Sequence, residues 1–207
     1  IYNISFNKFI HNVNDDHTMS KPKQRSGGIK TARRVFDVLE LAQDRDGISL
    51  SDVAEELDIA SSTAHEYLIT LEDVGYLVRE EEQFYLGLTF LRYGTTARER
   101  LEYLDTIRPT LEKYANKIGE ALWYVAEENG EGICVLEKKG PQAAQITGGK
   151  VGEKVPLHAS ATGKVILASQ PDDRIEELNL PAYTPQTITD QETLREVIQT
   201  VREEGIA

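Results

Sequence analysis

The order of helix and strand signals between residues 30 and 86 restricts the fold of this chain most strongly. Residues 30–44 space their apolar side chains as a helix does. The pattern predicts a wide buried face that contains positions 32, 35, 36, 38, 39, 41 and 42. Ser49 and Asp52 then form an S-x-x-D pattern, in which each side chain satisfies an unpaired amide of the other at a helix start.

Two further helices and a hairpin follow this start. Residues 51–57 predict a short helix, and residues 58–60 a turn. Residues 62–73 predict a longer helix that ends before a glycine. The β-prone runs 76–78 and 84–86 flank the polar tip EEEQ and predict a hairpin. Helix, short helix, turn, helix and hairpin together indicate a winged helix-turn-helix.

The third of these helices has two different sides. Its apolar residues recur at helical spacing and are expected to be buried: Ala64, Tyr67, Leu68 and Leu71. Small polar and charged residues occupy its start and its outer face: Ser61, Ser62, Thr63, His65 and Glu66. In a helix-turn-helix this end enters the major groove of DNA. The alternative is that the hydroxyl groups only cap the helix.

A mostly helical stretch, residues 86–120, connects this region to the second half of the chain. Gly94 and Pro109 are expected to mark a bend or break in it. Its apolar residues form a stripe that needs a partner, at positions 88, 91, 97, 101, 104, 107, 111 and 118. Either a second copy of the chain or the chain's own C-terminal domain is expected to cover this stripe.

The second half begins with strands and ends with helices. The β-prone runs 123–126 and 133–136 are separated by ENGEG and predict a hairpin. Residues 145–147 and 154–156 are candidates for further strands. Helices are expected after Pro156 and in two later amphipathic segments, 172–178 and 191–205. The last residues, Gly-Ile-Ala, resemble the lead-in to a strand, so we expect this second domain to be truncated here.

The charge balance is strongly acidic, with 35 acidic against 23 basic residues and a net charge of −12. Between residues 28 and 90, five basic and fourteen acidic residues give a local net charge of −9. This opposes nucleic-acid binding through counterion release, because such binding needs positive charge. A host with molar internal salt is the alternative, since an acidic surface keeps a protein soluble there.

Other compositional features exclude several classes of protein. The single cysteine, Cys134, rules out a disulfide framework and a multi-cysteine metal site. No apolar run is long enough to span a bilayer, and no secretory leader is recognisable. We therefore expect a cytoplasmic protein with no membrane partner and no metal. Residues 1–18 differ in character from the rest, which indicates an upstream extension or a disordered arm.

Taken together, several segments resemble the IclR family of transcriptional regulators. The segments are LSDVAEELDIASSTAHEYLITLEDVGYLV, FYLGLTFLRYG, PLHASATGK, TPQTIT and LREVIQTVREEGIA. The resemblance implies an α+β chain with a winged helix-turn-helix DNA-binding domain at 28–90, linker helices at 91–118 and an incomplete GAF-like effector-binding domain at 119–207. Residues 1–27 are then a disordered arm or upstream extension.

The resemblance also implies a function and two sites. A family member binds a palindromic operator in double-stranded DNA as a homodimer or dimer of dimers, and a small organic acid or related metabolite modulates binding or transcription, with no cofactor. The expected DNA-binding residues are Lys30, Arg33, Arg34, Ser61, Ser62, Thr63, His65, Glu66 and Arg79. The expected effector-binding residues are Leu157, His158, Ala159, Ser160, Ala161, Thr162, Gly163 and Lys164. The simpler interpretation of the second set is that Ser160 and Thr162 cap a helix and Gly163 permits close packing.

Some residues depart from the family pattern. Ser61 stands where a basic residue is usual, Glu66 stands where arginine is usual, and the tip of the hairpin, residues 80–82, is acidic. Base-edge contacts and shape would then carry more of the affinity than phosphate contacts. One alternative function is a protein-interaction module with a degenerate winged helix. An enzyme would need Cys134 and His158 as nucleophile and base, but the apolar neighbours of Cys134 favour a buried structural cysteine.

Overall fold

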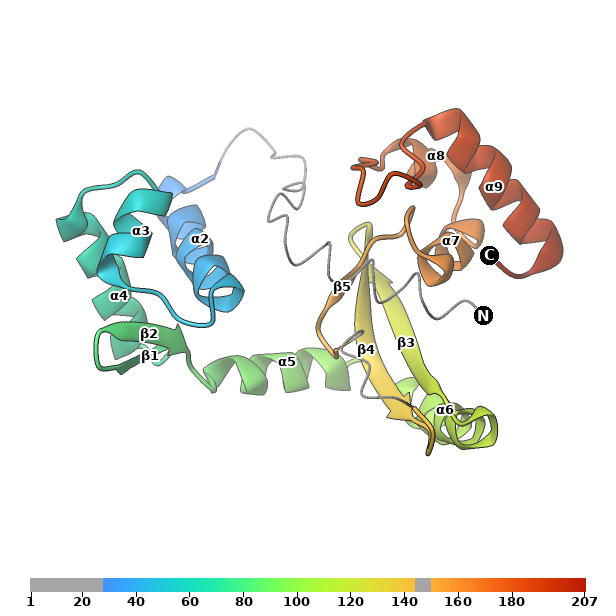
Figure 1. Cartoon of the computed structure of the whole chain (residues 1–207), viewed down its shortest axis with the longest axis horizontal. Helices are drawn as coiled ribbons and strands as arrows, with labels where there is room; N and C mark the ends of the chain where they lie inside the picture. The colour runs from blue at the N-terminus through green and yellow to red at the C-terminus, as the bar shows by residue number, and fades with distance from the viewer. Residues whose placement is uncertain (1–27, 144–149) are drawn as a thin grey trace. The chain divides into compact units, whose positions relative to one another are not determined.

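The computed structural model describes residues 28–143 and 150–207, and the chain divides into two compact units (Figure 1). Among the described residues, one unit contains 28–101, and the other contains 102–143 and 150–207. The expectations for residues 1–27 and for a strand at 145–147 lie outside the described residues.

The N-terminal unit is a winged helix-turn-helix, as the sequence predicts. Its elements, in chain order, are α2 (Lys30–Asp44), α3 (Leu50–Glu56), α4 (Ser61–Asp73), β1 (Leu77–Glu80), β2 (Gln83–Leu86) and α5 (Thr89–Glu99). Strands β1 and β2 are antiparallel, with Glu80 opposite Gln83 at the tip. Ile48, just before α3, exchanges two backbone hydrogen bonds with Phe84 of β2, at 3.0 and 2.8 Å. These bonds join the wing to the helix-turn-helix.

The capping pattern at the start of α3 is confirmed. The Ser49 amide donates to Asp52 Oδ2 at 2.7 Å, and the Asp52 amide donates to Ser49 Oγ at 3.2 Å. The hydrogen bonds from Ser49 lower the pKa of Asp52 below its ordinary value. Two amides at this helix start are therefore satisfied by side chains, which fixes where α3 begins.

The core of the N-terminal unit gathers one side of each helix and the inner side of the wing. Side chains with at most 1% exposure come from α2, α3, α4 and β1: Val38, Val53, Ala64, Leu68 and Leu77. The expected face of α2 is too wide, because Ala32 and Phe36 are exposed, Phe36 to 64%. Only the side of α2 that meets α4 and β2 is covered within this unit.

The helical stretch after the wing is interrupted, but not where the sequence suggests. Helix α5 ends at Glu99, and α6 begins at Leu104. Gly94 lies inside α5 and Pro109 lies inside α6, so the expectation that either marks the break is wrong. Leu104 and Ala115 of α6 are buried at 4% and 1% exposure, and this packing offsets the backbone hydrogen bond that Pro109 cannot donate.

The C-terminal unit combines a three-stranded antiparallel sheet with helices. After α6 (Leu104–Ile118), its elements are β3 (Ala121–Glu128), β4 (Glu131–Lys139), β5 (Lys154–Val155), α7 (Ala161–Ala168), α8 (Asp172–Glu176) and α9 (Gln191–Glu204). The sheet order is β3-β4-β5, and α6 packs against β3 and β4. Asn129 and Gly130 both have positive φ, at 56° and 86°, as a two-residue hairpin turn requires. The predicted hairpin and helices are confirmed.

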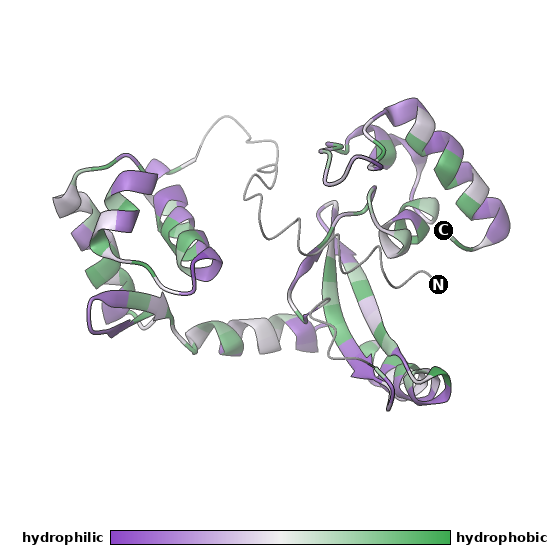
Figure 2. Cartoon of the chain, in the orientation of Figure 1, coloured by the Kyte–Doolittle hydropathy of each residue, from purple (hydrophilic) through white to green (hydrophobic). Residues whose placement is uncertain are grey.

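A second core lies among the helices of this unit. Apolar and polar residues alternate along α9 in Figure 2, and its apolar side packs on α7 and α8. The buried members of this core are Leu157, Leu167, Ile175, Leu194 and Ile198. Arg202 of α9 also donates to the carbonyls of Ala168 and Gln170, at 2.9 and 2.8 Å, which satisfies acceptors at the end of α7. Among the described residues, no helix has the length and apolar character needed to cross a membrane.

Candidate functional site

Helix α4 begins without a side-chain cap. Its N-cap residue is Ala60, in extended conformation with φ −63° and ψ 143°, and no side chain accepts a hydrogen bond there. Ser61 and Ser62 occupy the first two helical positions and are exposed, and Thr63 is half-buried. The alternative that these hydroxyl groups serve as caps is therefore wrong. The amides of this first turn have no acceptor within the helix, so they and the hydroxyl groups face outward together.

The two sides of α4 are sharply different. Ala64, Leu68 and Leu71 are buried at 0%, 1% and 3% exposure, whereas His65 and Glu66 are exposed. Tyr67 is half-buried and packs against the core. The buried side holds the helix on α3 and β1. The structure thus brings the five predicted α4 residues to one end of the helix and leaves four of them exposed.

A tight turn sets the angle between α3 and α4. Asp58 adopts the left-handed conformation, with φ 49°, which a short polar side chain tolerates. The Ile59 amide donates to the Ala54 carbonyl at 3.1 Å, and Ile59 packs against the core. The turn is thus held by a backbone hydrogen bond and by the packing of Ile59, which together set the direction in which α4 leaves α3.

The four predicted basic residues lie on α2 and on the wing. Arg34 donates from Nη1 to the Leu57 carbonyl at 2.7 Å, so it joins α2 to the end of α3. Arg79 donates from Nε to the Glu81 carbonyl at 2.9 Å and lies over the Phe84 ring, 5.4 Å from its centroid. Lys30 and Arg33, at the start of α2, have exposed side chains. Arg34 and Arg79 therefore have structural partners, which sequence reasoning did not find.

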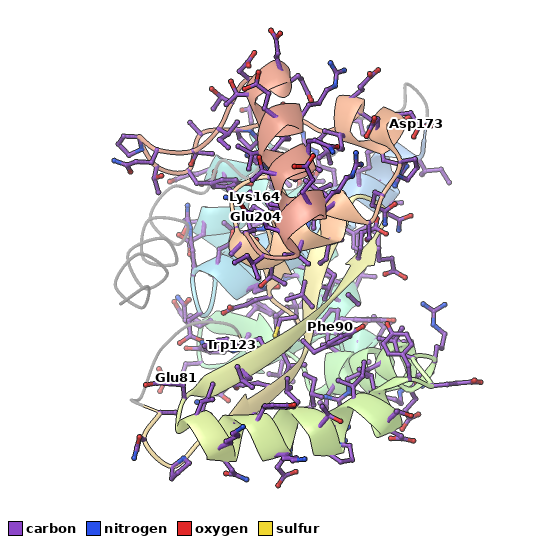
Figure 3. The ribbon with its side chains drawn as sticks, turned by 90° about the vertical axis from the view of Figure 1, so that its right-hand side faces the viewer. Glu81, Phe90, Trp123, Lys164, Asp173 and Glu204 are labelled. Atoms are coloured by element: carbon purple, nitrogen blue, oxygen red, sulfur yellow. The ribbon has the colours of Figure 1, made fainter. Side chains whose placement is uncertain are left out.

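An aromatic cluster between the wing and α5 also escaped sequence reasoning. Tyr76 donates a hydrogen bond from its hydroxyl to that of Tyr93 at 3.0 Å, and the two rings stack at 5.9 Å. This hydrogen bond raises the pKa of Tyr76 and lowers that of Tyr93. Phe90, labelled in Figure 3, meets the Tyr76 ring edge-on at 5.2 Å. The spacing of Phe90 and Tyr93 on one side of a helix was the available signal.

The segment 157–164 is divided between buried and exposed residues. Leu157, His158, Ser160 and Gly163 are buried. Ser160 Oγ accepts from the Gly163 amide and donates to the Pro156 carbonyl, both at 2.9 Å. A Cβ on Gly163 would lie 2.3 Å from the Leu157 carbonyl oxygen. The simpler interpretation of Ser160 and Gly163, as cap and packing residue, is thus confirmed.

The remaining residues of that segment lie at or near the start of α7 and reach solvent. Ala161 and Thr162 are exposed, and Ala159 and Lys164 are half-buried. Figure 3 labels Lys164 on α7. Thr162 is the second helical residue, and the N-cap interaction belongs to Ser160 alone. The exposed Thr162 hydroxyl and the Lys164 side chain are therefore the groups in this segment that a ligand can reach.

His158 connects this segment to the loop before α9. Its Nε2 donates to the Pro181 carbonyl at 3.0 Å, and its ring lies 5.6 Å from the ring of Tyr183. Burial lowers the pKa of His158 below its ordinary value, although the hydrogen bond to Pro181 opposes this effect. Burial also raises the pKa of Tyr183. His158 is thus a neutral, buried group at neutral pH, held between two segments.

We expect the C-terminal unit to lose stability as the pH falls below 6.5, the ordinary pKa of histidine. The unfolded chain then takes up a proton that buried His158 resists, so unfolding is favoured by at most about 1.4 kcal/mol per pH unit. Urea unfolding, followed by fluorescence of the single tryptophan, Trp123 of β3, measures this. His158→Gln should flatten the profile between pH 5 and 7, whereas His65→Gln should not. Equal profiles for wild type and His158→Gln would contradict the assignment.

Cys134 is a buried structural cysteine, as its neighbours predict. Its side chain is 1% exposed, and burial raises the pKa of the thiol to about 11. The thiol donates to the Leu136 carbonyl, with sulfur and oxygen 3.9 Å apart. A protonated, buried thiol is a poor nucleophile, which argues against the Cys-His enzyme. Within the described residues, no group of histidine, cysteine or acidic side chains could hold a metal ion.

Comparison with known proteins assigns both units to one family. Residues 31–81 match the model of the IclR helix-turn-helix domain, and residues 95–207 match that of the bacterial transcriptional regulator IclR C-terminal domain. The HTH-type transcriptional regulator BhcR of Paracoccus denitrificans is 30% identical over 88% of this chain and 67% of its own length. The probable regulator ArcR of Halobacterium salinarum is 28% identical over 86% of this chain and 71% of its own.

Solved structures agree with this assignment. An IclR homolog from Microbacterium hydrocarbonoxydans, complexed with 4-hydroxybenzoate, matches with a TM-score of 0.67 at 26% identity, over 85% of this chain and 75% of that one. The IclR of Thermotoga maritima matches with a TM-score of 0.60 at 26% identity, over 87% and 75% of the two chains. With an intact winged helix-turn-helix and matches over both units, this chain belongs to the IclR family of transcriptional regulators.

Proposed function

We propose that this chain regulates transcription by placing the start of α4 in the major groove of an operator, under control of a small molecule. The observation that carries the proposal is that Ser61 and Ser62 are exposed at an uncapped helix start. Small hydroxyl side chains allow the backbone to approach a duplex closely, and the unpaired amides can meet a phosphate. The DNA-binding set then comprises the exposed α4 residues with Lys30 and Arg33, and Arg79 on the wing.

Few basic side chains are available for phosphate contacts in this binding. Arg34 bonds to the Leu57 carbonyl, and Glu81 lies at the tip of an acidic wing (Figure 3). If Lys30 and Arg33 supply the phosphate contacts, a dimer makes four of them, and log K should fall with log salt at a slope of only about −4. DNA affinity that persists at high salt suits a host whose cytoplasm is rich in salt. We place this acidic protein in that cytoplasm.

A gel shift with the full chain and the DNA upstream of its own gene tests the proposal. The experiment is run at about 0.1 M and about 1 M KCl, where the Debye length falls from about 10 Å to about 3 Å. A specific band that persists at the higher salt, and that unlabelled random duplex does not compete away, supports the proposal. Absence of a band at both concentrations contradicts it and favours the protein-interaction module, for which the acidic wing is the supporting observation.

The C-terminal unit is the proposed effector-binding domain, with a GAF-like fold. The relative from Microbacterium hydrocarbonoxydans is complexed with 4-hydroxybenzoate, which makes a small organic acid the class to test. In this chain the start of α7 supplies the Thr162 hydroxyl, and Lys164 supplies a positive charge. The other residues of segment 157–164 shape and support this helix start. Ligand-induced shifts in melting temperature across a panel of small acids, 4-hydroxybenzoate among them, test the assignment.

A homodimer, or a dimer of two such dimers, is the proposed assembly. Helix α5 has no buried residue, and Leu88 and Leu91 near its start are 85% and 68% exposed. Phe36, on the uncovered side of α2, is also exposed. Helix-turn-helix proteins bind the two halves of a palindrome as symmetric dimers, so a second copy of the chain is the natural partner for these side chains. By contrast, α6 packs on the chain's own sheet.

Combined Leu88→Glu and Leu91→Glu substitutions should produce a monomer. Both side chains are already in contact with solvent, so the fold should persist while the apolar contact between copies is lost. Loss of bivalent contact should weaken operator binding by about hundredfold or more. Analytical ultracentrifugation measures the assembly. The control is Ile206→Glu, because Ile206 is also an exposed apolar residue, at 69%, but lies outside α2 and α5. A dimer that survives the double substitution would place the interface elsewhere.

A further inference from the structure

Glu66 lies at the middle of the outward side of α4. Its position is about opposite the buried residues Ala64 and Leu68 around the helix axis, with Ser62 and Thr70 one turn away on either side. Glu66 is exposed, and among the described residues it has no hydrogen bond or ion pair. By contrast, Asp52 has a structural role in its capping box, and Glu56 pairs with Arg45. Glu66 has no such role.

The chemistry of a carboxylate limits what Glu66 can contact on DNA. It accepts hydrogen bonds and donates none, and its charge repels phosphate. The major groove offers two donors, the N4 amine of cytosine and the N6 amine of adenine. In adenine the acceptor N7 lies beside the amine and repels a carboxylate, whereas in cytosine the neighbouring group is a C–H. Thymine and guanine present acceptors at their edges, which a carboxylate also avoids.

The neighbours of Glu66 permit this contact. Ser62 and Thr70 are short and exposed, so the helix can approach the base edges closely at either side of Glu66. Glu66 is the longer side chain and extends beyond them. This placement rests on the proposed function, in which α4 enters the major groove. We propose that Glu66 is a specificity-determining residue, and that its carboxylate accepts a hydrogen bond from the N4 amine of a cytosine in each operator half-site.

Selection from a random duplex library with the full chain tests this. Wild type should enrich sequences with an invariant cytosine in each half-site. Glu66→Gln should prefer adenine at that one position, and Glu66→Arg should prefer guanine, because these side chains pair with those bases. On the selected duplex, changing the cytosine to thymine should weaken wild-type binding by roughly tenfold to hundredfold and weaken Glu66→Gln much less.

Asp73→Asn is the matched control, since it removes one negative charge from the exposed end of the same helix. It should leave the preferred base unchanged. If the wild-type protein enriches no sequence, the proposed function itself fails and takes this inference with it. If the wild type enriches a sequence but the Glu66 variants select the same base, or if wild-type affinity ignores the cytosine-to-thymine change, the inference alone is wrong.

Discussion

Replacing Ser62 with glutamate is expected to weaken specific operator binding by about hundredfold or more without lowering the melting temperature. The new side chain brings bulk and negative charge to the point where α4 meets the duplex. It should therefore disrupt base contacts that are worth about 1–3 kcal/mol each. Stability should hold, because Ser62 caps nothing and is exposed. A carboxylate in the first turn even favours the helix, by about 0.3–1 kcal/mol.

Ser51→Glu provides the matched control for this substitution. Ser51 is also the second residue of a helix, α3, and is also exposed. In a helix-turn-helix this helix crosses the backbone and does not enter the groove, so Ser51→Glu should cost about tenfold or less. Fluorescence anisotropy with a selected duplex and thermal melting by circular dichroism measure both quantities. Equal losses of affinity in the two variants would mean that charge, and not the position of α4, decides binding.

Gly163→Ala should destabilise the C-terminal unit by about 3 kcal/mol or more. The added Cβ would lie 2.3 Å from the Leu157 carbonyl oxygen and 2.4 Å from the Leu157 Cα, so backbone must move. Such a loss corresponds to a drop in melting temperature of about 10–20 °C for a unit of this size. Trp123 fluorescence reports this unfolding, because Trp123 lies on β3 of the same unit.

Gly94→Ala is the contrasting substitution. Gly94 lies inside α5, and a Cβ there would meet nothing within 4 Å. Alanine should therefore stabilise that helix by about 0.5–1 kcal/mol. If both glycine substitutions changed the melting temperature by the same small amount, the close contact between Gly163 of α7 and Leu157 would be contradicted. Loss of effector-induced melting shifts in Gly163→Ala would further tie the start of α7 to ligand binding.

The local features of the fold were predictable because they depend on nearby residues. Ser49 and Asp52 form the expected capping box within one helical turn. Asn129 and Gly130 take the two positive φ values that their hairpin turn requires. The buried stripe of α4 follows from helical periodicity alone. Each of these features is determined by residues that lie within a few positions of one another in the sequence.

Features that depend on distant partners were not predictable in the same way. In the sequence, Arg34 cannot be told apart from an exposed basic residue of α2. Only the folded chain shows its hydrogen bond to the carbonyl of Leu57, 23 residues away. Phe36 fits the apolar pattern of α2 but lies outside the part that this unit covers. The linker is interrupted between α5 and α6, at residues 100–103, where the sequence has no glycine or proline, and it is not interrupted at Pro109. Tertiary packing decided each of these cases.

The two candidate sites differ in how far sequence could define them. For α4, the apolar pattern of the sequence was enough to separate the buried side from the exposed side. The absence of a cap became visible only in the structure, from the backbone angles of Ala60. For segment 157–164, sequence marked a helix start but did not show which residues face inward. His158 and Ser160 proved to be held within the protein, which leaves Thr162 and Lys164 as the accessible groups.

Amide hydrogen exchange at the start of α4 tests the central claim most directly. The amides of Ser61, Ser62 and Thr63 have no acceptor within the helix, so they should exchange quickly in the free protein. Nuclear magnetic resonance of the isotope-labelled full chain can follow them with and without a selected duplex. The account predicts that all three slow markedly in the complex, while exposed amides of α9 do not. Unchanged exchange at these three amides in a saturated specific complex would contradict it.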